Sequence, residues 1–144
     1  MAYSTYSLND VSVVVSNHDF GNRTITGEGL GSITTEMTTD RTTHETAADG
    51  AVMVSKVNGR NGTIAIVLQQ TSAAHQWLTK LYNYLEAATA EKWAATSITI
   101  TTLATGETES CTGVSFTKLP SNPRQAQGQN LTWTLMAADI QRTF

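Results

Sequence analysis

The chain has 144 residues, of which 40% are hydrophobic and 15% are charged, and its formal net charge is −3. This length is enough to bury one modest core, so we expect a single domain over residues 1–144. The acidic balance disfavours a protein that grips nucleic-acid phosphates, because such a protein needs a basic surface. The single cysteine, Cys111, excludes an intrachain disulfide and a cysteine zinc cluster.

Threonine accounts for about one residue in six. Its branched side chain suits pleated, half-exposed surfaces, so the composition favours broad sheets that face other protein. The first ten residues lack the basic and apolar segments of a signal peptide, and no apolar run approaches the ~20 residues of a membrane span. We therefore expect neither a secretion signal nor a membrane segment.

The strands predicted first are short, and a long hairpin follows them. The short strands cover residues 11–15 and, more weakly, residues 23–26. In the hairpin, residues 31–68, an Asp49-Gly50 turn joins two strand-like arms. Asp-Gly between such arms is a strong signal for a two-residue turn, which needs positive φ at both positions. The first arm is polar over residues 38–46, and a hairpin that buries nothing needs a partner chain to complete it.

A single helix and a second group of strands complete the prediction. Over residues 71–88, Trp77, Leu81 and Leu85 recur on one helical face. Strand-like alternation then returns over residues 96–138. The strands expected there are residues 96–103, 109–116 and 131–140, with a proline-containing loop at residues 120–129. We predict a mainly β fold, which is a β-barrel or sandwich of two packed antiparallel sheets with one flanking α-helix and a long protruding hairpin.

Residues that carry catalysis are scarce. His18, His44 and His75 fall in a predicted loop, strand and helix, so the sequence does not gather them into one site. The glycines of GEGLGS, residues 27–32, precede a strand, whereas a phosphate-binding glycine loop opens a helix. We therefore predict no enzyme activity, no metal site and no cofactor.

One charged cluster stands out on the first arm of the hairpin. On a continuous strand, Glu36, Asp40 and His44 share one face because they lie four residues apart. Arg41 and Glu45 lie on the other face. One interpretation is an ordinary solvated sheet face. The other is a wet, mildly acidic surface on one side of the hairpin and a contact with a neighbouring subunit on the other.

Five segments carry a family resemblance, in the same order along nearly the whole chain. They are YSLNDVSVVV, DRTTHETAADGAVMVSK, NGTIAIVLQQTSAAHQWLTKLYNY, ITITTLATGETESCTGVSF and TWTLMAAD. No single segment is diagnostic, but the ordered set resembles the tail tube proteins of tailed bacteriophages, in particular the small tube subunits of contractile-tailed phages. The tubes of type VI secretion systems are related to this family in fold.

The resemblance implies a structural virion protein that forms homohexameric rings stacked head to tail, with DNA passing through the lumen from capsid to host. It makes Glu36, Asp40 and His44 candidates for lining the lumen. It also implies that the hairpin contacts an adjacent subunit or ring. The candidates for that contact are Arg41, Glu45, Asp49, Gly50, Met53 and Lys56.

The implied partners are other copies of the chain, a tail sheath if the tail contracts, and the tape measure, baseplate and tail terminator proteins. The implied location is the tail tube of the virion, assembled in the cytoplasm of the host bacterium. Two alternatives remain open at this point. One is a tube subunit of a type VI-like secretion system, and the other is a monomeric β-barrel that binds a ligand.

Overall fold

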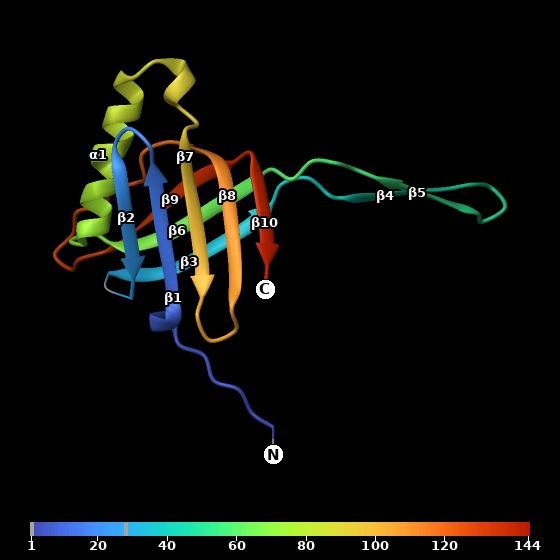
Figure 1. The fold of residues 1–144 in the computed structure, drawn as a ribbon, viewed down its shortest axis with the longest axis horizontal. Coiled ribbons are helices and arrows are strands. Elements are labelled where there is room, and N and C mark those ends of the chain that lie inside the picture. The colour runs from blue at the N-terminus through green and yellow to red at the C-terminus, as the bar shows by residue number, and fades with distance from the viewer. Residues whose placement is uncertain (1, 28) are drawn as a thin grey trace.

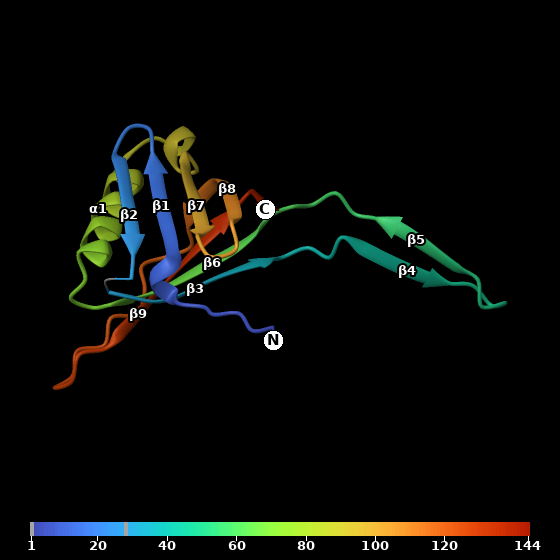
Figure 2. The same cartoon turned by 60° about the horizontal axis from the view of Figure 1, so that its bottom comes forward.

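The computed structural model describes residues 2–27 and 29–144, and its main feature is an antiparallel sheet of eight strands. The sheet bends so strongly that it forms two packed layers (Figures 1 and 2). Its strands are β1 (Val11–Asn17), β2 (Gly21–Thr26), β3 (Leu30–Met37), β6 (Gly62–Gln69), β7 (Thr96–Thr102), β8 (Glu107–Phe116), β9 (Asn130–Ala137) and β10 (Asp139–Thr143). They run in the order β2-β1-β7-β8-β9-β6-β3, and β10 also pairs with β8. The predicted mainly β fold of two packed antiparallel sheets is confirmed.

Strand β8 belongs to both layers. Its first part pairs with β7 and β10, whereas Ser115 and Phe116 pair with β9 in the other layer. The strand changes direction at Gly113, which has a φ of +63°. A Cβ atom at Gly113 would lie 2.7 Å from the Cβ atom of Ala138, so glycine serves both the bend and the close approach of the chains.

The C-terminal segment, predicted as one strand over residues 131–140, is two strands in two layers. Residue Ala138 separates β9 from β10, and its N–H lies 3.0 Å from the carbonyl oxygen of Thr112. The buried positions change register at this break, because Ala137 and Ile140 are both buried. Arg142 Nε then lies 3.3 Å from the carboxylate of Glu109 and helps to hold β10 against β8.

The predicted long hairpin is also interrupted. Strands β3 and β6 belong to the body, whereas β4 (Thr42–Thr46) and β5 (Val52–Lys56) form a separate two-stranded sheet that projects far from it (Figure 2). Four residues, 38–41, link β3 to β4, but five residues, 57–61, link β5 to β6. This difference shifts the pairing register, and the two glycines Gly59 and Gly62 allow the irregular backbone.

The turn at the hairpin tip is longer than predicted. Within the turn, Gly50 has positive φ, at +90°, whereas Asp49 does not. The N–H of Ala47 donates to the carbonyl of Ala51 at 2.8 Å, and the N–H of Gly50 donates to the carbonyl of Ala47 at 3.0 Å. The turn is therefore a three-residue loop that ends in a left-handed glycine, not a two-residue turn.

Helix α1 (Ala73–Ala87) lies at the open side of the two layers, where it contacts β2 and β6 (Figure 1). Its first turn is capped by Ser72, whose Oγ accepts from the N–H of His75 at 3.2 Å. A 3₁₀ turn at Ala90–Lys92 follows. Among the helices of residues 2–27 and 29–144, none is long and apolar enough to cross a membrane.

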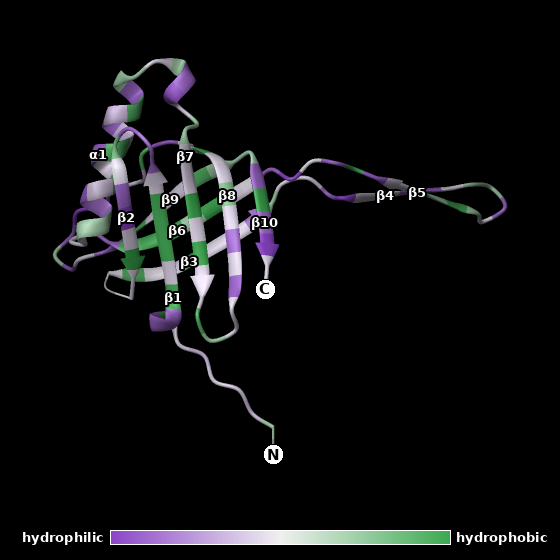
Figure 3. Ribbon diagram, viewed as in Figure 1, coloured by the Kyte–Doolittle hydropathy of each residue, from purple (hydrophilic) through white to green (hydrophobic). Residues whose placement is uncertain are grey.

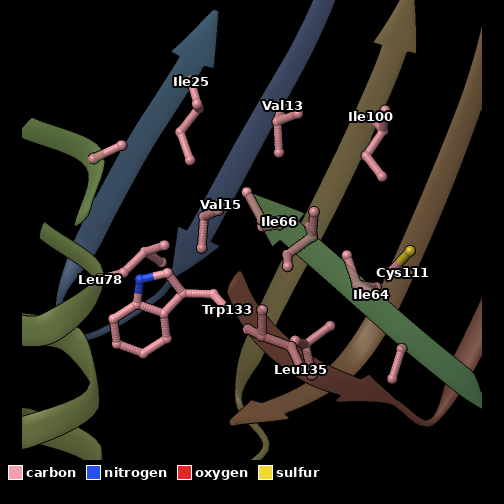
Figure 4. Packing of buried hydrophobic residues seen from close by; sticks show 14 of the residues in the cluster. Val13, Val15, Ile25, Ile64, Ile66, Leu78, Ile100, Cys111, Trp133 and Leu135 are labelled. Carbon is pink, nitrogen blue, oxygen red and sulfur yellow. The ribbon is translucent and has the colours of Figure 1, made fainter. Parts of the chain in front are cut away.

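The core fills the space between the layers and the helix. Hydrophobic residues alternate along the body strands, which accounts for the green bands in Figure 3. The indole of Trp133 is completely buried between the sheet and Leu78 of α1 (Figure 4). It packs edge-on to Phe116 with ring centroids 5.3 Å apart, and its Nε1 donates to Nδ1 of His75 at 3.1 Å.

The contact between Trp133 and His75 predicts a pH-dependent stability. Burial lowers the pKa of His75 below its ordinary value of 6.5, and the neutral imidazole is the form that accepts from Trp133. The unfolded chain therefore binds this proton more readily than the folded chain does. The stabilisation should be fully present above pH 6.5 and should decline as the pH falls from 6.5 towards the lowered pKa.

Urea unfolding at a series of pH values between about 5 and 7.5 measures this effect. The matched control is His75→Gln, which keeps a polar side chain but has no imidazole. Because His18 and His44 remain in both proteins, the difference between the two pH profiles isolates His75. Identical profiles for the two proteins would contradict the assignment.

Candidate functional site: the hairpin and a threonine-rich sheet face

The separate hairpin is uncovered on both faces. Every residue of β4 and β5 is exposed, including three consecutive apolar residues. These are Val52 at 51%, Met53 at 60% and Val54 at 63% exposure. Figure 3 shows the same contrast, with a mostly hydrophilic hairpin and hydrophobic colour near its tip. A two-stranded ribbon with no core is at best marginally stable in water, so covering its apolar side chains would stabilise it.

The apolar residues divide between the two faces of the hairpin. Residues that pair directly across an antiparallel ribbon share a face. Thr42, His44, Thr46, Val52, Val54 and Lys56 therefore form one face, and Thr43, Glu45, Met53 and Ser55 form the other. Each face combines apolar and polar groups, so either one is suited to a protein contact.

The base of the hairpin is fixed to the body. Arg41 Nε donates to the carbonyl of Val57 at 2.6 Å, across the two linking segments. The carbonyl of Arg60 accepts from the N–H of Ile140 in β10 at 3.0 Å. Arg60 Nε also lies 3.3 Å from a carboxylate oxygen of Asp139, as an ion pair without hydrogen-bond alignment. These contacts set the direction in which the hairpin leaves the domain.

The predicted cluster of Glu36, Asp40 and His44 does not lie on one continuous strand face. Glu36 is on β3 and His44 is on β4, in separate sheets, and Asp40 lies in the segment between them. The prediction assumed unbroken alternation through residues 36–44, but residues 38–41 do not belong to a strand. Arg41, expected opposite the cluster, lies in the same linking segment.

Glu36 belongs to a broad outward face of the body. Its neighbour Thr35 points inward, since Thr35 Oγ1 donates to the buried Glu109 at 2.5 Å. Alternation then places Glu36 outward, and cross-strand pairing extends this face over β6, β9 and the end of β8. Its three rows are Glu36-Thr63-Met136-Ser115, Thr34-Ala65-Thr134 and Ser32-Val67-Thr132. Within these rows Glu36 is the one charged residue, and most of the others are Ser or Thr. The face is therefore rich in hydroxyl groups and slightly acidic.

Groups that could carry catalysis are scarce among the described residues. Over the part of the chain that the structure describes, no three His, Cys, Asp or Glu residues gather in a way that could hold a metal ion. Burial, together with Glu109 and Asp139, raises the pKa of the Cys111 thiol to about 11. A thiol with that pKa is a poor nucleophile at neutral pH, so Cys111 acts as a small apolar core residue.

An uncovered hairpin with exposed apolar residues beside an open sheet face is typical of a structural protein that contacts other chains. The chain belongs to the bacteriophage PhiTE tail tube protein family, which matches residues 3–144. It is a structural tail tube protein and not an enzyme, as the resemblance implied.

Solved structures with the same fold come from contractile injection systems. A chain of the PVC sheath/tube terminator structure, from an extracellular contractile injection system in its extended state, has a TM-score of 0.69 at 14% identity, and the match covers 100% of both chains. A chain of the PVC sheath-tube complex has a TM-score of 0.61 at 17% identity, covering 91% of this chain and 87% of that one. A chain of the anti-feeding prophage baseplate has a TM-score of 0.61 at 12% identity, covering 99% and 97%. No curated protein sequence matches the chain.

Sequence reasoning named Met53 in the hairpin but missed its neighbours Val52 and Val54. Both are more than half exposed and contribute to the opposite face from Met53. The signal was available, because a Val-Met-Val run in a polar hairpin has no core of its own to enter.

Proposed function

We propose that this chain is the repeating subunit of a phage tail tube, assembled as hexameric rings that stack head to tail around a DNA channel. The observation that carries this proposal is the uncovered hairpin with its exposed Val52, Met53 and Val54, in a chain of the tail tube family. A heterologous contact of this kind repeats along an axis, since it joins two different surfaces and leaves one of each unoccupied.

In this assembly the threonine-rich sheet face lines the channel. Glu36 faces the lumen, with Asp40 and His44 towards its rim. The absence of Lys and Arg from the three rows supports this orientation, because a ring of cations would bind DNA phosphates and slow their passage. Hydroxyl groups stay hydrated and hold no phosphate by charge.

The hairpin is the contact with an adjacent subunit. Its contact residues are Arg41, Glu45, Asp49, Gly50, Met53 and Lys56, together with Val52 and Val54. Exposure of all these residues except the half-buried Arg41 supports the proposal, since a contact surface must be free before assembly. Burying the apolar side chains contributes about 25 cal/mol per Å² removed from water.

The further partners that we propose are a tail sheath, a tail terminator, a baseplate and the tape measure protein. The neighbours in fold are named for a sheath-tube complex, a sheath/tube terminator, a baseplate and a cap, which supports three of these. We place the chain in the tail tube of the virion, after assembly in the cytoplasm of the host bacterium.

A tube that delivers protein instead of DNA is the second candidate. It is favoured by the neighbours that belong to extracellular contractile injection systems. The two candidates share the assembly and differ in the cargo, so the presence or absence of packaged DNA in the purified particle decides between them.

Negative-stain electron microscopy of the purified chain tests the assembly. Tubes or six-fold rings are the expected result. A monodisperse monomer at every concentration and salt condition, seen also by size-exclusion chromatography, would instead support a ligand-binding β-barrel and reject the proposed function.

Reversing the charge of the channel face should slow DNA passage. Glu36→Lys places one ammonium group per subunit on a face that otherwise has no cation, so DNA phosphates gain contacts. Tube length should stay normal, and the rate of DNA release from the particle, followed with a DNA-binding dye, should fall by about tenfold.

The control for this experiment is Glu86→Lys, which makes the same charge change at an exposed position of α1. It should leave the release rate unchanged. Equal rates for Glu36→Lys and the unmodified particle would remove any electrostatic role of this face.

A further inference from the structure

The molecule carries an extension at each end of its long axis. At one end is the hairpin β4-β5, and at the other is the connection between β8 and β9, residues 117–129 (Figures 1 and 2). The two extensions are opposite in net charge. Residues 42–56 of the hairpin carry Glu45 and Asp49 near the tip and Lys56 at the base, whereas residues 117–129 contain Lys118 and Arg124 but no Asp or Glu. All five charged side chains are exposed.

The β8-β9 connection has no regular secondary structure, yet it is held in place. The amide of Gln70, which directly follows β6, donates from Nε2 to Asn122 Oδ1 at 2.8 Å and also to the carbonyl of Pro123. Gln70 Oε1 accepts from the N–H of Gln129 at 3.1 Å. With two prolines in addition, the connection is a preorganised surface that loses little conformational freedom on binding.

The hairpin has an open hollow near its tip. An open hollow of about 490 Å³ beside the tip is lined by Glu45, Thr46, Ala47, Ala51, Val52 and Met53. The connection offers an apolar side chain next to a basic one, because Leu119, of which 47% is exposed, follows Lys118. Apolar groups beside charges of opposite sign on the two surfaces give both burial and orientation.

We propose that residues 42–55 of the hairpin dock on the β8-β9 connection, residues 117–129, of another copy of this chain. This inference rests on the proposed function and names the surface that receives the hairpin in the next ring. Glu45 and Asp49 face Lys118 and Arg124 across the contact, and the guanidinium of Arg124 suits a carboxylate in a paired geometry. Because the two surfaces lie at opposite ends, the contact repeats along one axis.

Charge exchange between two variants tests the proposal. In the hairpin variant, Glu45→Lys and Asp49→Lys make both extensions basic. In the loop variant, Lys118→Glu and Arg124→Glu make both acidic. Each variant alone brings like charges together, so the protein concentration at which tubes appear should rise by at least about tenfold. An equal mixture of the two variants should again form tubes, because each hairpin then meets a connection of opposite charge.

Control variants match the charge changes at other exposed positions. Glu86→Lys with Glu91→Lys corresponds to the hairpin variant, and Lys80→Glu with Lys92→Glu corresponds to the loop variant. Both controls should form tubes like the unmodified chain. Circular dichroism and thermal melting should show that all four variants fold, since the altered side chains are exposed.

The outcomes separate the inference from the proposed function. If the hairpin and loop variants form tubes at the unmodified concentration, or if their mixture fails to restore tubes that each has lost, the hairpin docks elsewhere and the inference is wrong. If the unmodified chain itself never forms rings or tubes, the proposed function is rejected and the inference with it.

Discussion

A chain without the outer hairpin should fold normally and fail to form tubes. The change joins Arg41 to Val57 through Asn-Gly, which replaces residues 42–56. These two residues suit a two-residue connection, because the N–H of Val57 already donates to the carbonyl of Arg41 at 2.9 Å. The expected loss of assembly is complete, since the deletion removes the exposed apolar residues Val52, Met53 and Val54 together.

The deletion should not change the stability of the domain. Residues 42–56 contribute nothing to the core, and the two-stranded sheet pairs only with itself. The free energy of unfolding should therefore stay within about 0.5 kcal/mol of the unmodified value, as for other surface changes. A thermal melt measures the fold, and sedimentation with electron microscopy measures assembly.

A milder variant serves as the matched control for the deletion. Val52→Thr, Met53→Ser and Val54→Thr keep the length and pairing of the hairpin but remove its apolar groups. This variant should weaken assembly without abolishing it if main-chain and charge contacts also contribute. Tubes of normal length from the deletion variant would show that the hairpin has no part in stacking.

Trp133→Ala should cost about 3–5 kcal/mol of stability, a large share of the roughly 5–15 kcal/mol typical of a domain. The indole is completely buried, packs on Phe116 and donates to His75 of the helix. Its removal leaves a cavity where the sheet, the helix and the aromatic cluster meet. The helix should then separate from the layers at lower denaturant concentration.

Urea unfolding followed by circular dichroism measures this loss. Trp133→Phe is the control, since it keeps a ring in the core but removes the donor to His75. Trp133→Phe should lower the free energy of unfolding by about 1–2 kcal/mol, since it removes one buried hydrogen bond and some packing contacts. Similar values for the two variants would mean that the indole nitrogen, and not the ring volume, carries the contribution.

Local patterns in the sequence were enough to predict most of the elements. The helical period placed Trp77, Leu81 and Leu85 on one face, and Leu81 and Leu85 are buried. The helix predicted over residues 71–88 is observed as Ala73–Ala87, with its cap at Ser72. These features depend on the period of the backbone and on bonds within a few residues, which any window of the sequence contains.

The candidate site was predicted only in part. The polar character of the hairpin was visible in the composition of residues 38–46, and the full exposure of β4 agrees with it. Met53 was named only as a contact that the family resemblance implied. The shared face of Glu36, Asp40 and His44 was not correct, because the first arm leaves the strand over residues 38–41 and continues in a separate sheet. The interruption accompanies a one-residue difference in length between the two linking segments, which is visible only when the arms are paired.

The sequence alone therefore determines the strands, the helix, the acidic and threonine-rich surfaces and the family to which the chain belongs. The three-dimensional arrangement adds the bend of β8 at Gly113, the passage of the chain between layers at Ala138 and the position of the two charged extensions at opposite ends. These features depend on hydrogen bonds and packing between segments that are distant in sequence. A period of two or 3.6 residues specifies which face of an element is apolar, but it carries no information about which other element will cover that face.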